Sequence, residues 1–245
     1  MHLPDPTFPP LLTGHAVKGR PAPFEQACAK AAAGEAGAGD IYWARDTARL
    51  DWACVLEPEV ATARALQMHF VAMLAFGDAF GAISPPEVAL HFRWPSDLLI
   101  NGGKAGRAKL ALGPENADGI ADWMVVGIEL TIKRDTTGFE PGDAPDDTAL
   151  HEEGCGEITR TELVESLSRH FLNWVHTWNE EGFKGVHEGW LAKAENWQEE
   201  VTLTWEGETR SGTFVTIDDE GNLLLKTEEG MVSLPIAGAV ERQPA

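Results

Sequence analysis

The sequence is poor in basic residues and in cysteine, and both shortages exclude classes of protein. It has 19 lysines and arginines against 39 aspartates and glutamates, a formal net charge of −20. Such a surface repels a phosphate backbone, so we expect no nucleic-acid partner. The three cysteines, Cys28, Cys54 and Cys155, are an odd number without metal-ligand spacing, which argues against a disulfide framework and a zinc site. A reducing cytoplasm is the expected location.

Long uninterrupted apolar runs are also missing. The longest, residues 60–83, is broken by Arg64, Gln67, His69 and Asp78, and the N-terminus has no basic start followed by an apolar stretch. We therefore expect no signal peptide and no membrane partner. The eight histidines show no His-Glu-x-x-His spacing, so no metal held by the protein is expected.

What is present is a mixture of helical and strand patterns. Pro58 opens an apolar stretch that predicts a buried helix, and Thr159 with Glu162 forms a capping box ahead of a helix that Gly182 ends. Asn101-Gly102 between apolar arms predicts a hairpin. The predicted helices cover 24–33, 58–81, 159–182 and 187–197. The predicted strands cover 11–17, 41–43, 52–56, 88–95, the two arms of 97–112, 123–133, and then 201–205, 211–217, 222–226 and 231–234. Residues 134–145 are expected to form a solvated loop, and the four short C-terminal strands a small antiparallel barrel.

The segment between the helices resembles a known signature. Arg93-Trp-Pro-Ser-Asp97 followed by Asn101-Gly-Gly-Lys-Ala-Gly106 is similar to biotin protein ligases, where a Lys-Trp-Pro-Asn-Asp box leads through a hairpin to a lysine and a glycine. The stretches 125–128 and 148–150 look like the family's glycine-containing strand and a nearby turn. The resemblance covers about residues 40 to 240.

The resemblance implies the biotin/lipoate ligase fold and its chemistry. The fold class is then α+β, a mixed sheet flanked by helices over residues 1–195, with a small SH3-like β-barrel over 198–243. In such a ligase a carboxylic acid attacks the α-phosphate of ATP, whose Mg²⁺ is held by the phosphates, and a carrier-protein lysine then takes the acyl group. Lys104 would pair with the ligand carboxylate or the α-phosphate, and Asp97 would orient the incoming amine or the Mg²⁺. The implied ligand-binding residues are Arg93, Trp94, Ser96, Ala105, Gly106 and Gly127.

The hairpin register decides whether Asp97 and Lys104 can act together. A two-residue turn pairs Leu99 with Lys104 and puts Asp97 and Lys104 on one face of the sheet, whereas a three-residue loop puts them on opposite faces. The resemblance favours the first arrangement or a bulge. The structural alternatives are that Lys104 is a solvated turn residue, that Asp97 caps a turn, and that Trp94 packs in the core.

Three departures from the family leave two other functions open. The glycine-arginine loop that closes over the nucleotide corresponds to residues 44–51, which contain no glycine. Arg93 and Ser96 replace the lysine and asparagine of the box, and residues 19–23 replace an early Ser-Thr-Asn motif. The protein could therefore be a non-catalytic paralogue that binds a small acid. Acyl transfer through Cys155 is a further alternative, but neighbouring carboxylates would raise the pKa of that thiol and favour an inert one.

Overall fold

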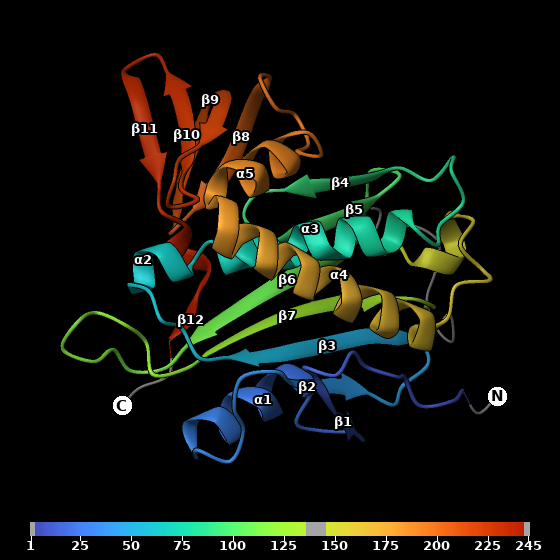
Figure 1. Ribbon diagram of the computed structural model, residues 1–245. Helices are drawn as coiled ribbons and strands as arrows, with labels where there is room; N and C mark the ends of the chain where they lie inside the picture. Colours follow the sequence, from blue (N-terminus) through green and yellow to red (C-terminus); the bar gives the residue numbers. More distant parts are fainter. Residues whose placement is uncertain (1–2, 136–145, 243–245) are drawn as a thin grey trace.

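The computed structural model describes residues 3–135 and 146–242, which form two β-sheets with helices packed around the larger one (Figure 1). The larger sheet has the strand order β1-β2-β3-β7-β6-β5-β4, and β12 pairs with β6. The pairs β1–β2 and β12–β6 are parallel and the others antiparallel, so the sheet is mixed, as predicted. Its strands are β1 (Thr13–Val17), β2 (Asp40–Ala44), β3 (Arg49–Leu56), β4 (Leu90–Arg93), β5 (Asp97–Ile100), β6 (Gly103–Leu112), β7 (Met124–Thr131) and β12 (Glu241–Arg242).

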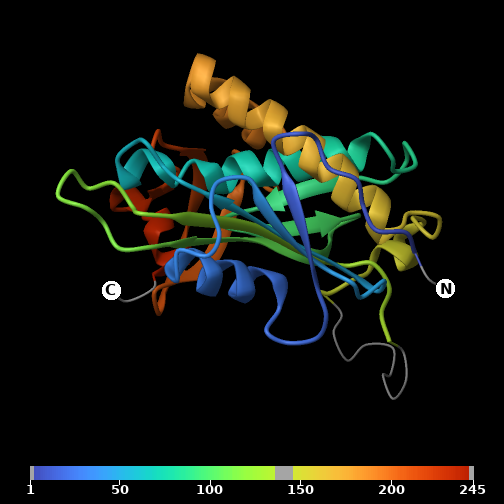
Figure 2. The ribbon, with the colours of Figure 1, turned by 60° about the horizontal axis from the view of Figure 1, so that its bottom comes forward.

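Helices cover both faces of this sheet. Figure 2 shows α1 on one face and α3 and α4 on the other. The helices are α1 (Pro23–Ala32), α2 (Thr62–Ala65), α3 (Met68–Gly81), α4 (Arg160–Glu181) and α5 (Phe183–Leu191), with short 3₁₀ turns at Leu150–Glu153 and Ile236–Ala239. One apolar core lies between the sheet and α3 and α4, and a smaller one lies under α1. Among the described residues no helix is long and apolar enough to cross a membrane.

The second sheet is the predicted small C-terminal β-unit. It is antiparallel with the order β11-β10-β9-β8, and it lies beside α5 (Figure 1). Its strands are β8 (Glu200–Trp205), β9 (Glu208–Ile217), β10 (Leu223–Thr227) and β11 (Gly230–Leu234). The positive φ of Gly207, Gly221 and Gly230 explains why each connection carries a glycine.

The single helix predicted over 58–81 is wrong, because the structure divides it into α2 and α3. Around Gln67 the backbone bonds span three residues, from Gln67 N to Arg64 O and from His69 N to Leu66 O. The Gln67 side chain bonds to the Asp219 carbonyl and accepts from the Trp178 indole, so tertiary contacts hold this tight turn.

Other elements also differ from the prediction. The helix expected at 187–197 is α5, which starts one residue after Gly182, because Phe183, Val186 and Trp190 are all buried. Strand β3 begins at Arg49, not at residue 52, since Leu50 alternates into the core. Strand β12 was not predicted, and most of the expected loop at 134–145 lies outside the described residues.

Candidate active site

The hairpin β5–β6 brings Asp97 and Lys104 together. Asn101 and Gly102 have φ of 50° and 91°, and a two-residue type I′ turn requires positive φ at both positions. Leu99 pairs with Lys104, as predicted for a two-residue turn. The Lys104 Nζ lies 2.6 Å from the Asp97 Oδ1. The lysine side chain is 38% exposed and the aspartate 22%, so the pair is open to solvent on one side.

A β-bulge sets which other side chains join this pair. Leu98 pairs with Gly106 while Leu99 pairs with Lys104, so Ala105 is an extra residue on β6. The insertion shifts the alternation by one position and places Arg107 on the same face as Lys104. Without the bulge, that arginine would point into the core under α3.

The result is a row of five charged residues in register across five neighbouring strands, which we name the charged row. Arg93 of β4 pairs with Asp97, Asp97 with Arg107, Arg107 with Glu129 of β7, and Glu129 with Asp51 of β3. Paired residues on neighbouring strands share a face, so all five side chains lie on the face that α1 partly covers. The sequence reasoning missed Glu129 and Asp51, although each is an acidic residue inside an apolar strand pattern.

A hollow of about 340 Å³ opens over this face. Four basic side chains and two carboxylates line it, although the whole chain has a net charge of −20. The hollow is lined by Arg49, Lys104, Ala105, Gly106, Arg107, Glu129, Leu130, Thr131, Arg134, Asp147 and Thr148. A second hollow, of about 530 Å³, shares Arg49, Arg107 and Glu129 with the first and is also lined by Asp51. The excess of positive charge in the first hollow suits an anionic ligand.

Asp147 and Thr148 line one side of the first hollow. The Lys104 amide donates to the Asp146 carbonyl, and the Thr148 amide donates to the Lys104 carbonyl. At Gly106 an added Cβ would lie 2.1 Å from the Glu129 carbonyl oxygen, so only glycine fits where β6 meets β7. The backbone around Lys104 is therefore fixed from both sides.

Other residues that the resemblance implied lie outside both hollows. Arg93 is on the same face but pairs with Glu195 at 2.6 Å. Trp94 is buried and donates its indole N–H to the Gly221 carbonyl. Its ring centroid lies 4.6 Å from that of Trp205 on β8, so Trp94 connects the two sheets. Gly127 lies under α1, where an added Cβ would be 2.6 Å from the Phe24 ring.

The turn before Asp97 is held by a residue that sequence reasoning did not select. His69 of α3 is buried, and its Nε2 lies 3.0 Å from the Pro95 carbonyl oxygen and 3.2 Å from the Ser96 Oγ. Burial lowers the pKa of His69 to about 4, so the ring is neutral and its Nε2–H donates to the carbonyl. Nothing but a histidine inside an apolar helix signalled this role.

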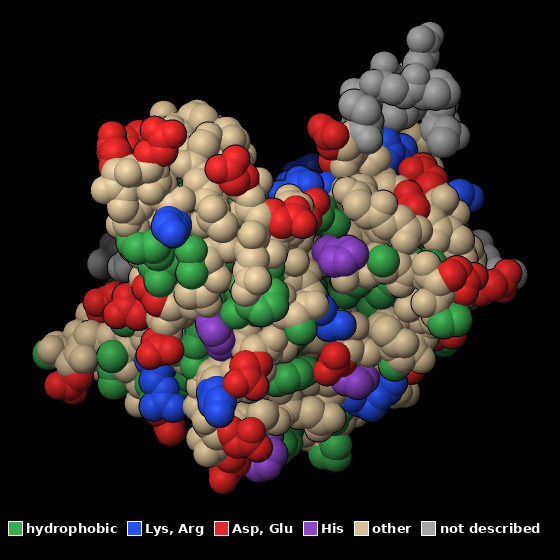
Figure 3. Space-filling view, turned by 90° about the horizontal axis from the view of Figure 1, so that it is seen from above, with side chains coloured by type: hydrophobic (Ala, Val, Ile, Leu, Met, Phe, Trp, Pro, Cys, Tyr) green, Lys and Arg blue, Asp and Glu red, His purple; other side chains and the backbone are tan. Residues whose placement is uncertain are grey.

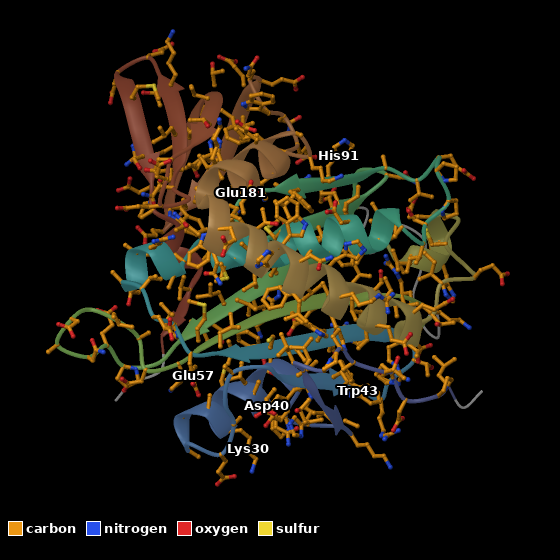
Figure 4. All side chains as sticks on the ribbon, viewed as in Figure 1. Lys30, Asp40, Trp43, Glu57, His91 and Glu181 are labelled. Carbon is orange, nitrogen blue, oxygen red and sulfur yellow. The ribbon has the colours of Figure 1, made fainter. Side chains whose placement is uncertain are left out.

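The loop between β2 and β3 and the first residue of β3 have arginines that are engaged in other contacts. Arg45 pairs with Asp5 at 2.6 Å and stacks over Trp43, which Figure 4 labels on β2, and Arg160 stacks over the same ring. Arg49 has an ion pair with Asp51 at 3.0 Å. Residues 44–51 contain no glycine, so this segment presents no glycine backbone for a phosphate.

Neither a metal centre nor a reactive thiol emerges from the described residues. No group of three or more His, Cys, Asp or Glu side chains in them could hold a metal. All three cysteines are free and buried, and burial raises the pKa of Cys155, with Glu153 and Glu87 adding to the effect.

In the space-filling view, acidic side chains are spread over the visible face with basic ones scattered between them (Figure 3).

Comparisons with known proteins identify the family of this chain. The model of the biotin/lipoate A/B protein ligase family matches residues 8–192, and that of the biotin protein ligase C-terminal domain matches residues 199–240. The chain therefore belongs to the biotin/lipoate A/B protein ligase family. The two matches lie in series along the chain, and the second covers the strands β8 to β11 of the smaller sheet.

Individual relatives are consistent with that assignment. The biotin–[acetyl-CoA-carboxylase] ligase of Paracoccus denitrificans is 29% identical, over 80% of this chain and 81% of the relative. The bifunctional ligase/repressor BirA of Bacillus subtilis is 25% identical, and the match covers 72% of this chain but only 53% of that longer protein.

Among solved structures, a biotin protein ligase-like protein of unknown function from Silicibacter sp. TM1040 has a TM-score of 0.86 and 38% identity, over 96% of this chain and 98% of that one. The Aquifex aeolicus biotin protein ligase in complex with biotin and ATP has a TM-score of 0.74 and 20% identity, over 92% and 96% of the two chains. The second likeness shows the fold alone.

Proposed function

We propose that this protein activates a small carboxylic acid, of the broad class that includes biotin and lipoate, with ATP and transfers it to a lysine of a carrier protein. The observation that carries the proposal is the Lys104–Asp97 pair at the edge of a hollow lined by four basic side chains. The Aquifex aeolicus relative, whose structure holds biotin and ATP, supports the choice of ligands.

The described residues fit the charges of this reaction. The acid's carboxylate oxygen would bond to the α-phosphorus while pyrophosphate leaves, and Lys104, Arg107 and Arg49 would neutralise the negative charge that gathers there. Phosphate-bound Mg²⁺ would enter with the nucleotide.

In the second step a lysine amine would attack the acyl carbon, AMP would leave, and the amine would lose a proton. Asp97 would hold that amine in position, because its carboxylate already holds an ammonium group, that of Lys104, at 2.6 Å. Three free thiols without a disulfide support a reducing compartment, the cytoplasm.

Exchange of labelled pyrophosphate into ATP tests the proposal. Exchange should depend on an added acid, and Lys104→Ala should reduce it by at least about a hundredfold, the scale of one lost charge-stabilising contact. Lys184→Ala, at an exposed position of α5, is the matched control and should keep full exchange. Absence of exchange with biotin, lipoate, fatty acids and amino-substituted acids alike would refute the enzymatic proposal.

One observation favours a second candidate, a binding protein without catalysis. The arginines of the loop at 45–49 are tied to Asp5 and Asp51, and no glycine frees that backbone for the nucleotide. Such a protein would be stabilised against heat by its acid and would show no exchange. The cysteine-dependent acyltransferase alternative is not favoured, since the Cys155 thiol is buried and its pKa is raised.

A further inference from the structure

The turn at residues 94–96 joins β4 to β5 and sets where Asp97 begins its strand. On the sheet side, the Ser96 carbonyl accepts a hydrogen bond from a β6 amide. On the helix side, His69 of α3 places its Nε2 3.0 Å from the Pro95 carbonyl oxygen and 3.2 Å from the Ser96 Oγ. The two residues directly before Asp97 are therefore anchored to both the sheet and the helix.

The His69 ring is itself held firmly, so it can fix the turn. The residue is 2% exposed, and its ring lies edge-on to the Phe70 ring at a centroid distance of 5.7 Å. The ring is neutral, and its single Nε2–H is shared between the Pro95 carbonyl and the Ser96 hydroxyl oxygen. Without this donor, the turn would lose its anchor to α3.

From these contacts we infer that His69 is a positioning residue for the second step of the reaction, where it acts through the turn on the Asp97 carboxylate. The inference rests on the proposed function, because Asp97 is taken to hold the incoming lysine amine. In that step the amine nitrogen bonds to the acyl carbon, the bond from that carbon to the AMP oxygen breaks, and the amine releases a proton to solvent. A misplacement of the amine by about 1 Å slows such a step by up to about a hundredfold. His69 lines neither hollow, so its effect on the reaction passes through Asp97.

The first step should depend on His69 much less. The basic side chains of the first hollow are taken to neutralise the phosphates, and the Lys104 backbone is fixed by its own bonds to Asp146 and Thr148. These bonds do not involve the turn at residues 94–96. Loss of His69 should therefore separate the two steps, whereas a general loosening of the fold would slow both.

Rates of the two steps in a His69→Leu variant test the inference. Pyrophosphate exchange with biotin, or with lipoate where biotin gives none, measures the first step. Acylation of Nα-acetyl-lysine by the preformed adenylate measures the second. We expect His69→Leu to slow the second step at least about tenfold and to change exchange by less than about threefold. His91→Leu, at an exposed position of β4, is the matched control and should keep both rates.

Two polar variants show whether the position of the donor matters. The amide nitrogen of glutamine is three bonds from Cβ, like the histidine Nε2, whereas that of asparagine is only two bonds away. His69→Gln should therefore keep the second step within about threefold of the wild type, and His69→Asn should be about as slow as His69→Leu. A glutamine variant as slow as the leucine variant would overturn the inference.

A double-mutant cycle with Asp97 separates positioning from a purely structural role. If His69 acts through Asp97, then His69→Leu should slow the second step no further in a protein that already carries Asp97→Ala. Urea denaturation establishes that each variant is folded. Losses that multiply in the double variant would overturn the inference, and so would exchange that is slowed as much as transfer in His69→Leu.

Acetylation of Lys104 by acetic anhydride, followed by mass spectrometry, reads the position of Asp97 without any substrate. Because the Lys104 Nζ lies 2.6 Å from the Asp97 Oδ1, loss of that partner should speed labelling about two- to fivefold in His69→Leu but not in His69→Gln. Lys184, exposed on α5, is the internal reference. A wild type that exchanges no pyrophosphate with any acid would refute the ligase proposal, and the labelling alone would then decide whether His69 positions Asp97. Equal labelling of Lys104 in the wild type and His69→Leu would overturn that role in either case.

Discussion

Acidification should destabilise this protein through one buried histidine. His69 is protonated with a pKa near its ordinary value of 6.5 in the unfolded chain, but burial lowers its pKa to about 4 in the folded one. Between these values the unfolded state binds more protons, so stability falls as pH falls. The full contribution is present above pH 6.5 and is lost progressively toward pH 4. Linkage gives a loss of about 2 kcal/mol between pH 7 and pH 5 from this residue alone.

A single substitution isolates this contribution. In His69→Gln the side-chain amide can still donate to the Pro95 carbonyl but does not titrate. We therefore expect urea denaturation of the wild type and the variant to diverge by about 2 kcal/mol from pH 7 to pH 5, in favour of the variant at the lower pH. All other titrating groups are common to both proteins and cancel.

His91→Gln controls for the loss of a histidine as such, because His91 lies exposed on β4 (Figure 4). That variant should follow the wild type across the same pH range. Parallel stability curves for the wild type and His69→Gln would refute the reasoning, since they would mean that the buried ring takes up its proton in the folded protein as readily as in the unfolded one.

Two further substitutions test the packing. Gly127→Ala should lower the free energy of unfolding by about 1–3 kcal/mol, because the added Cβ would meet the Phe24 ring at 2.6 Å, and thermal unfolding measures it; an unchanged melting temperature would show that α1 moves aside without cost. Thr159→Ala should cost about 1 kcal/mol, since it removes the capping-box bond to the Glu162 amide at the start of α4. Thr177→Ala, later in α4, is the comparison, and equal losses of unfolding free energy in the two variants, measured by urea denaturation, would argue against the cap.

Much of the local structure followed from neighbouring residues. Asn101-Gly102 specifies a turn with positive φ, and Thr159 with Glu162 specifies a helix start, because both depend on groups only a few residues apart. Both predictions are confirmed. The helix predicted over 58–81 failed for the opposite reason, since the turn at Gln67 depends on Trp178 and Asp219.

The candidate site could be predicted only in part. Asp97 and Lys104 lie in one short hairpin, and the motif they belong to placed them in the same cleft. Glu129 and Asp51 were out of reach, since β3 and β7 are adjacent only in the folded sheet, and no local pattern gives that pairing. The catalytic and binding roles of Asp97 and Lys104 remain predictions.

The sequence by itself determined the family, the turn between β5 and β6 and the start of α4, because each rests on a few residues close together in the chain. Tertiary structure alone decided the rest of the site. The bulge at Ala105 turns Arg107 onto the face of Lys104, and the four pairings between five neighbouring strands line up the charged row. A one-residue shift in register reverses every side chain that follows it, so this arrangement depends on the assembled sheet.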